Sequence, residues 1–418
     1  MRAGQWMGWG LILACLALVT GCHPPAQILW SPDGSAAVYR GDSDTILMDS
    51  SGKIFSRLGK SDGGMAWSKN SKTLYYVNAV TDGEVATADP AWLISIAAEA
   101  NSATKPADPE TDSHRAELKS VTNGKTTLLA RFAGGVLHIA LSPDENWLAL
   151  CGEMGAADTG LSIYVYHLPT KHLYQLSNNA GTAMCFTGPN KLVIEEQDLR
   201  SSSPSAVPGR LVEVTLDAKA PPAAENLLSI IPSETAWTAA VGENLLFTTM
   251  PHQYPGKYTK NDNRSDFKLF QWTRANGSVV SIADDVGSLF AVSPDGQRVL
   301  IERVSPNDDK DKEKHTLEVI RSNGSDGHAL RDLGPYNDFA IWPAWRGNDE
   351  ITFTNPVADG KRVPADGKVH VQYEVVQYKL TDKFELSPIA TLSDSWDAAD
   401  KPFVEINNAP GTQPTTMP

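Results

Sequence analysis

The phrase Trp-Ser-Pro-Asp-Gly at residues 30–34 returns as Leu-Ser-Pro-Asp-Glu at 141–145 and as Val-Ser-Pro-Asp-Gly at 292–296. A fourth copy, Trp-Ser-Lys-Asn-Ser at 67–71, keeps the first two residues and the polar turn. A short apolar run precedes each copy and another follows it, which predicts a strand, a tight turn and a second strand. Self-similarity at a spacing of tens of residues is typical of solenoids and propellers.

The residue types of this phrase explain the turn. Proline presets φ for the second position of a type I turn, aspartate tolerates the third, and glycine adopts the left-handed conformation that closes a three-residue hairpin. Where glycine is missing, Ser71 or Glu145 must adopt that conformation at some cost, or the turn must differ.

Apolar runs and turns divide the chain into seven units, most of which show a second hairpin. The residues that precede the first turn of each unit are Trp30, Trp67, Leu141, Phe186, Val241, Val292 and Trp345. Four antiparallel strands per unit, repeated in this way, predict an all-β fold, a β-propeller of four-stranded blades. We predict seven blades. Eight is an alternative because the stretch from 67 to 141 could hold another blade instead of an insertion with a short helix at 91–100, and six is an alternative if one of the weaker units does not form a blade.

The Ser-Pro-Asp-Gly turn resembles that of the TolB-like family of bacterial propellers, and the resemblance covers about residues 28–396. It implies the propeller fold and leaves function open, since many unrelated propellers share the motif. Residues 28–58 already supply four strands, and 403–406 is a candidate for pairing across the closing seam of the ring.

The N-terminal segment is predicted to be an export signal. Arg2 precedes an apolar stretch at 11–19 that is too short to span a membrane. The following Leu-Val-Thr-Gly-Cys at 18–22 resembles the bacterial lipobox, which implies cleavage before Cys22 and its acylation. The alternative is an ordinary secretory signal with an incidental cysteine. Because residue 23 is His and not Asp, the resemblance favours the outer membrane, facing the periplasm.

These patterns divide the chain into four parts. They are a lipoprotein signal peptide at 1–21, a lipidated cysteine with a short tether at 22–27, the β-propeller at 28–396, and a mostly disordered tail at 397–418. Several acyl chains on one residue give stable anchoring to the membrane.

Charge narrows the choice of partners. The chain has 50 acidic and 36 basic side chains, for a formal net charge of −14. An acidic surface argues against general nucleic-acid binding and against electrostatic adhesion to anionic lipid. Two cysteines beyond the signal, Cys151 and Cys185, lie in predicted strands. An oxidising compartment permits a disulfide between them, but we favour free thiols, because buried free thiols are common in strands.

Loop length points to one face of the predicted ring. The links between first and second strands are tight turns, whereas most links between second and third strands are long. Insertions confined to one face are typical of a binding face, although neutral drift also produces them. Among these links, the stretch 252–258 mixes aromatic rings with basic residues, so we select His252, Tyr254, Lys257 and Tyr258 as candidate binding residues.

Other polar groups give weaker signals for chemistry. The alternating carboxylates at 307–313 lack the glycine that a calcium loop needs for its sharp turn. Glu195, Glu196 and Asp198 fit an exposed acidic edge better than acid–base catalysis. We therefore expect neither a cofactor nor a metal.

Histidines offer the remaining route to an enzyme. Some TolB-like lyases gather histidines from several blades around a metal, and His138, His252 and His370 are the candidates for this here. The chain shows no Gly-x-Ser-x-Gly nucleophile elbow and no glycine-rich phosphate loop. We therefore predict an envelope lipoprotein that binds a protein, peptide or glycan through its long loops without catalysis. The alternative is a propeller lyase or hydrolase with its site at the channel mouth.

Overall fold

We analysed a computed structural model of the chain. It describes residues 27–41, 44–61, 63–80, 115–153, 161–197, 209–231, 235–249, 267–305, 314–334, 343–357, 362–365, 368–397 and 400–406. Within these ranges, no helix is long and apolar enough to cross a membrane.

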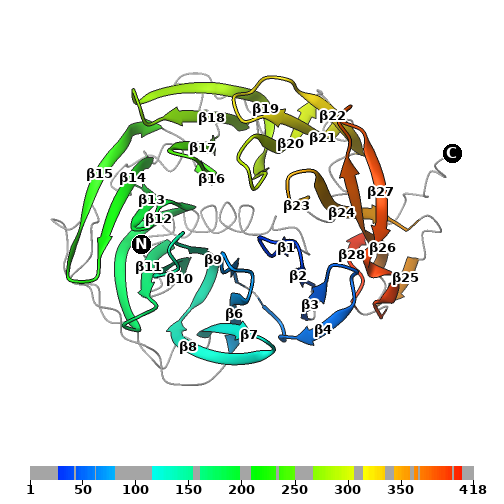
Figure 1. Cartoon of the computed structure of the whole chain (residues 1–418), viewed down its shortest axis with the longest axis horizontal. Coiled ribbons are helices and arrows are strands. Elements are labelled where there is room, and N and C mark those ends of the chain that lie inside the picture. The colour runs from blue at the N-terminus through cyan, green and yellow to red at the C-terminus, as the bar shows by residue number, and fades with distance from the viewer. Residues whose placement is uncertain are drawn as a thin grey trace, which may run out of the picture.

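The described strands form antiparallel sheets arranged in a ring around a common axis (Figure 1). Set 1 contains β1 (Gln27–Trp30), β2 (Ala36–Arg40), β3 (Thr45–Asp49) and β4 (Ile54–Arg57). Set 2 contains β5 (Met65–Trp67), β6 (Thr73–Val80), β7 (Arg115–Thr122) and β8 (Lys125–Ala133).

Two longer sheets follow, and each joins two sets of strands. The first contains β9 (Gly135–Leu141), β10 (Trp147–Glu153), β11 (Leu161–His167), β12 (His172–Gly188), β13 (Lys191–Gln197), β14 (Gly209–Asp217) and β15 (Ala220–Ile231). The second contains β16 (Thr235–Val241), β17 (Asn244–Thr249), β18 (Phe267–Thr273), β19 (Ser278–Val292), β20 (Arg298–Ser305), β21 (Lys314–Arg321) and β22 (His328–Gly334).

The long strands β12 and β19 each serve two sets. The first part of β12 pairs with β11 as the outer strand of set 3, and its second part pairs with β13 as the inner strand of set 4. In the same way, β19 ends set 5 against β18 and begins set 6 against β20. We number the sets on this basis, and the count of seven blades stays a prediction.

Set 7 completes the order of strands. It contains β23 (Ala344–Arg346), β24 (Glu350–Pro356), β26 (Lys368–Leu380) and β27 (Leu386–Thr391), and a 3₁₀ helix, η5 (Leu392–Ser395), follows. Two further strands, β25 (Arg362–Ala365) and β28 (Phe403–Ile406), pair with the first part of β26. The all-β propeller fold predicted from the sequence is therefore confirmed.

The hydrophobic core lies between the sets. One cluster of buried side chains separates each pair of neighbouring sets, including set 7 and set 1. Strand alternation produces this arrangement, because successive side chains point to opposite faces of a sheet. On β13, for example, Leu192 and Ile194 pack toward set 3, whereas Val193 packs toward set 5. Each such buried side chain stabilises the fold by about 1.5–3 kcal/mol.

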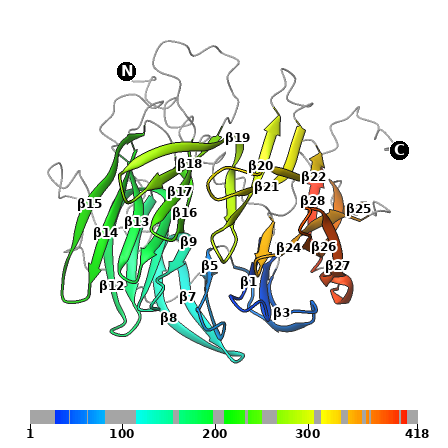
Figure 2. The ribbon, with the colours of Figure 1, turned by 45° about the horizontal axis from the view of Figure 1, so that its top comes forward.

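Side chains close the ring between set 7 and set 1. Strand β1 contacts β23 and β5; Figure 1 shows it beside β23, and Figure 2 shows it beside β5. The indole nitrogen of Trp396 donates to the carbonyl oxygen of Gly52 at 2.8 Å, and that of Trp30 donates to Thr352 Oγ1 at 2.9 Å. Gly52 has φ +87°, and a Cβ there would lie 2.1 Å from the carbonyl oxygen of Leu392, so only glycine fits.

Strand exchange does not contribute to this closure within the described residues. Residues 403–406, the candidate for pairing across the seam, pair with β26 in the last set instead. Arg57 of set 1 forms an ion pair with Asp400 at 2.8 Å, so the segment that leads into β28 also contacts the first set. The predicted helix at 91–100 lies outside the described residues.

Candidate functional site

The two ends of the sheets differ in how their strands are connected. At one end, first and second strands are joined by the short turns 31–35, 68–72, 142–146 and 293–297, and we call this end the turn face. At the other end, second and third strands are joined by 81–114, 154–160, 198–208, 250–266 and 306–313. We call it the long-loop face. The predicted segregation of loop lengths therefore follows from the observed strand order.

The turn face repeats one hydrogen-bond pattern. In the turn 293–297, Ser293 Oγ donates to Asp295 Oδ1 at 2.6 Å and accepts from the backbone N–H of Arg298 at 3.0 Å. The turns 31–35, 68–72 and 142–146 repeat both bonds, with Asn70 in place of aspartate in the second. The serine and the acidic or amide residue thus replace the missing backbone partners of each turn.

Neighbouring turns are also tied to one another. The residues in the glycine position, Ser71 and Glu145, have φ +62° and +60°, as predicted. Ser71 Oγ accepts from the backbone N–H of Asp33 at 3.0 Å, and Glu145 Oε1 accepts from that of Lys69 at 2.6 Å. At both positions, the side chain that makes the left-handed backbone unfavourable also accepts a hydrogen bond from the preceding set. A glycine could not form this bond.

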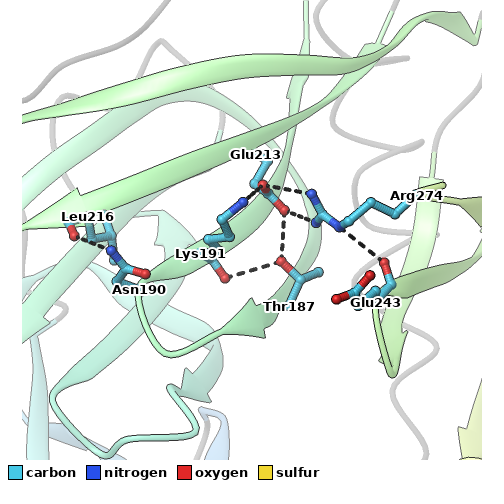
Figure 3. A network of polar contacts seen from close by, with 7 residues as sticks. All are labelled: Thr187, Asn190, Lys191, Glu213, Leu216, Glu243 and Arg274. Atoms are coloured by element: carbon cyan, nitrogen blue, oxygen red, sulfur yellow. Dashed lines mark hydrogen bonds and ion pairs between the residues drawn. The ribbon is translucent and has the colours of Figure 1, made fainter. Parts of the chain in front are cut away.

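A polar network between sets 4 and 5 strengthens the same face (Figure 3). Glu213 on β14 is buried, with 2% of its surface exposed. Lys191 Nζ donates to it at 2.9 Å, Thr187 Oγ1 also at 2.9 Å, and the guanidinium of Arg274 from the next set pairs with both of its oxygens. Burial alone would raise the pKa of Glu213, but these hydrogen bonds hold it below its ordinary value.

Buried or partly buried ion pairs join adjacent strands near the long-loop face. Arg210 pairs with Glu196 at 2.6 Å where β13 ends and β14 begins. The comparable ion pairs are Arg131 with Glu117 at 2.7 Å in set 2 and Arg303 with Glu318 at 2.7 Å in set 6. In set 6, a hydrogen bond also joins His315 Nδ1 and Glu302. These pairs fix the strand ends from which the long connections leave.

The pKa values of two of these glutamates move in opposite directions. Burial raises the pKa of Glu196, and the hydrogen bonds from Arg210 and Ser177 offset only part of that rise. For Glu117, the hydrogen bond from Lys119 and a second from Arg131 lower the pKa, against a smaller effect of burial. A carboxyl with a raised pKa is easier to protonate, and Glu196 is such a group at the base of the long loops.

The prediction of an exposed acidic edge at residues 195–196 is wrong. Glu195 and Glu196 are each 2% exposed. A Cβ on Gly181 of β12 would lie 2.0 Å from Glu195 Oε2, so the glycine leaves room for that carboxylate. Gly287 of β19 does the same for Glu302, with a distance of 2.3 Å. Inner-strand glycines thus accommodate a second-strand glutamate in both set 4 and set 6.

The selected binding residues belong to the connection between β17, which ends at Thr249, and β18, which begins at Phe267. The strand order assigns that connection to the long-loop face. His252, Tyr254, Lys257 and Tyr258 themselves lie outside the described residues. The same holds for Cys22 and for the carboxylates at 198 and 307–313.

Of the three histidine candidates, His138 alone has a described side chain. The ring of His138 on β9 packs against Trp237 on β16, with centroids 4.5 Å apart. No three His, Cys, Asp or Glu side chains of the described ranges converge as metal ligands. Cys151 and Cys185 are free thiols, and burial raises the pKa of each to about 12. Both therefore stay protonated, and unreactive as thiolates, at neutral pH.

Comparisons with known proteins add similarities of fold. No family model matches the chain, and no curated relative matches it. Among solved structures, it is similar to TolB from Acinetobacter baumannii at 15% identity, covering 80% of this chain and 72% of that one, with a TM-score of 0.40. It is similar to an oligogalacturonate lyase in complex with manganese at 12% identity, covering 79% and 85%, with a TM-score of 0.49.

A further similar structure is the β-propeller domain of the Trilobed protease from Pyrococcus furiosus, at 10% identity, covering 89% of this chain and 99% of that one, with a TM-score of 0.49. The resemblance to TolB-like propellers stated from the motif thus recurs among solved structures, alongside propellers of other kinds. The fold itself rests on the strand order described above.

Proposed function

We propose that this propeller is a non-catalytic binding module whose ligand face is the long-loop face, and that its partner is a protein, peptide or glycan. One observation carries the proposal, namely the difference between the two faces. The turn face is tied turn to turn by hydrogen bonds, whereas the long connections leave the other face from a base of buried ion pairs. Variable loops on a rigid scaffold are the usual arrangement of binding surfaces.

The proposal includes a location. An acylated Cys22 would hold the protein on the membrane of the bacterial cell envelope, at the outer membrane and facing the periplasm. The lipobox-like Leu-Val-Thr-Gly-Cys at 18–22 supports the anchor, and the histidine at position 23 supports the outer membrane. The tether 23–27 is short, reaching at most about 18 Å when fully extended, so the ring would lie close to the bilayer.

Site-specific photo-crosslinking tests the ligand face. A photoreactive amino acid at Tyr254 reports on the long-loop face, and one at Lys69, which is exposed on the turn face, is the matched control. In intact envelopes, we expect a discrete crosslinked product from position 254 and none from position 69. Crosslinking from position 69 alone, or from neither position, would contradict the proposal.

The anchor has an independent test. Replacing Cys22 with Ser removes the thiol that would be acylated, so the variant should leave the membrane fraction for the soluble one. Retention of Cys22→Ser in the membrane fraction would refute the lipid anchor without affecting the ligand-face proposal.

A further inference from the structure

Two partly buried arginines of the sheets, Arg298 and Arg331, have no carboxylate at ion-pair distance within the described ranges, and Arg331, at the junction of sets 6 and 7, is the one that bonds a residue near the long-loop face. Arg131, Arg210, Arg274 and Arg303 each pair with a glutamate. Arg331, on β22, contacts Asn355 and Tyr378 instead. Within the described ranges, no carboxylate lies at ion-pair distance from its guanidinium. In a chain of net charge −14, a partly buried cation without an acidic partner requires an explanation.

The surroundings of Arg331 hold its guanidinium in one orientation. The guanidinium carbon lies 5.2 Å from the ring centroid of Phe353, which in turn stacks on Tyr378 with centroids 4.5 Å apart. Nη1 donates to Asn355 Oδ1 and, at 3.2 Å, to Tyr378 Oη. Phe353 and Tyr378 are buried, so the platform beneath the cation is rigid.

Within the described residues, the contacts of Arg331 and Tyr378 leave several of their hydrogen-bond donors unused. A guanidinium has five N–H groups, and the described contacts of Arg331 use only those on Nη1. Tyr378 Oη accepts from Arg331 and from Asn355 Nδ2, so its own hydroxyl proton remains for another acceptor. Among the described residues, Nε, Nη2 and the phenol therefore keep donors for a further acceptor. Two adjacent guanidinium donors match the two oxygens of a carboxylate.

The position of this group links it to the proposed ligand face. Asn355 is the penultimate residue of β24, a second strand that ends on the long-loop face. Because Arg331 bonds Asn355, its guanidinium lies near the strand end from which the long connection of set 7 leaves. The carboxylate of a sugar acid is surrounded by hydroxyl groups, which need hydrogen-bond acceptors from the protein. The carboxylate of a peptide lies beside apolar carbon atoms, so it needs only hydrogen-bond donors and an aromatic surface, and both are present here.

We propose that Arg331, with Tyr378 and Asn355, binds a carboxylate of a peptide ligand, either its C-terminus or an acidic side chain. This inference rests on the proposed function, because it assigns a chemical class to the ligand of the same face. Arg331 forms the bidentate pair, Tyr378 adds a third hydrogen bond, and Asn355 orients both groups.

Small-molecule probes test the inference on the purified full chain. N-acetylglycine carries the carboxylate, and N-acetylglycinamide is its neutral match. In ligand-observed NMR titrations, we expect the acid to bind at least about tenfold more tightly than the amide, as two charge-assisted hydrogen bonds imply. Equal responses, or no response to the acid, would overturn the inference. Tighter binding of glucuronate than of N-acetylglycine would overturn the assignment to a peptide.

Variants locate the binding. Arg331→Gln should abolish the preference for the acid, and Arg331→Lys should restore only part of it, because an ammonium lacks the planar fork. Arg298→Gln is the matched control, since Arg298 lies 5.9 Å from the Phe384 ring on the turn face and also shows no carboxylate contact. Arg298→Gln should bind like the wild type. A thermal unfolding midpoint close to that of the wild type establishes that each variant is folded.

The outcome is separable from that of the proposed function. If position 254 crosslinks a partner and Arg331→Gln leaves both crosslinking and acid binding unchanged, the long-loop face is supported as the ligand face and the carboxylate site is refuted. If no partner crosslinks but N-acetylglycine binds through Arg331, the proposed partner is wrong and the carboxylate site stands.

Discussion

Two of the buried glutamates on the paired strands β13 and β14, Glu213 toward the turn face and Glu196 at the long-loop end, are held differently. Glu213, toward the turn face, receives hydrogen bonds from Lys191, Thr187 and Arg274, and its pKa is lowered. Glu196, at the long-loop end, pairs with Arg210, and burial raises its pKa. Both are 2% exposed, but the hydrogen bonds to Glu213 outweigh the effect of its burial on the pKa, whereas those to Glu196 do not.

This contrast extends to the two faces as wholes. The turn face uses its polar groups to join neighbouring sets, as Ser71, Glu145 and Arg274 do. The polar groups at the long-loop end mostly pair strands within a set, as Arg131 and Arg210 do. The first arrangement stabilises the ring, whereas the second fixes strand ends and leaves the connections beyond them able to vary.

The largest effect should come from Glu213→Gln. The change leaves Arg274 and Lys191 around a neutral amide, which we expect to cost about 3 kcal/mol of unfolding free energy at pH 7. Because the folded pKa of Glu213 is lowered, its contribution is present above the unfolded pKa and is lost as pH falls through the folded value. Urea unfolding at pH 7 and at about pH 3.5 should therefore show the deficit shrinking in acid.

Glu196→Gln is the control, because its effect on stability should depend on pH in the opposite direction. A raised folded pKa means that the wild type loses stability as pH rises from the unfolded to the folded value. The variant does not titrate, so its stability relative to the wild type should increase over that interval. If both variants showed the same pH dependence, the contrast between the two glutamates would be refuted.

Ser293→Ala should have the next largest effect. The serine is 3% exposed, and its hydroxyl bonds both Asp295 and the backbone N–H of Arg298. Loss of both bonds should cost about 2 kcal/mol, measured by urea unfolding. Ser35→Ala is the control, since Ser35 Oγ also donates to an aspartate of its turn at 2.8 Å but is exposed. Comparable losses at the two positions would show that burial does not set the strength of these turns.

The repeated phrase predicted what depends on local chemistry. The turns at 31–35 and 293–297, the positive φ of Ser71 and Glu145, and strands such as 45–49 all follow from residue types over a few positions. They follow because proline, aspartate and glycine act on their own backbone and its nearest neighbours. The fold could be derived from these units because repetition leaves few ways to bury their apolar faces.

Features set by distant residues could not be predicted in this way. Two prolines at 221–222 argue against a strand, yet β15 forms there because it is the outer strand of its sheet, where a missing N–H costs little. The continuity of β12 and β19 depends on bulges that shift register within them. Arg331 becomes a candidate site residue only because the fold places β22 next to β24, where it contacts Asn355. No spacing in the sequence indicates that contact.

A smaller effect should follow from removing the indole N–H of Trp67. Its Nε1 donates to the carbonyl oxygen of Leu29 in set 1 at 3.0 Å, and Trp345 bonds Ala291 of set 6 in the same manner. Benzothienylalanine keeps the ring shape and deletes the donor, so incorporation at position 67 should cost about 1 kcal/mol in urea unfolding.

Trp272 provides the comparison for this deletion. It is buried, and its Nε1 has no hydrogen-bond partner within the described part of the chain. The same replacement there should be neutral or stabilising, because it removes a buried polar group that is not satisfied. A loss at position 272 equal to that at position 67 would mean that ring packing, and not the bond between sets, determines the result.

The smallest effect concerns the glycine position of the turns. Glu145→Ala keeps the left-handed backbone and loses the bond from Lys69, whereas Glu145→Gly loses the same bond but relieves the backbone. The relief is worth about 1 kcal/mol, similar to what an exposed hydrogen bond contributes, so Glu145→Gly should lie within about 0.5 kcal/mol of the wild type. Glu145→Ala should lie about 1 kcal/mol below Glu145→Gly in the same unfolding assay. If alanine and glycine were equal, φ at this position would carry no cost, and the bond between turns would not be compensating for strain.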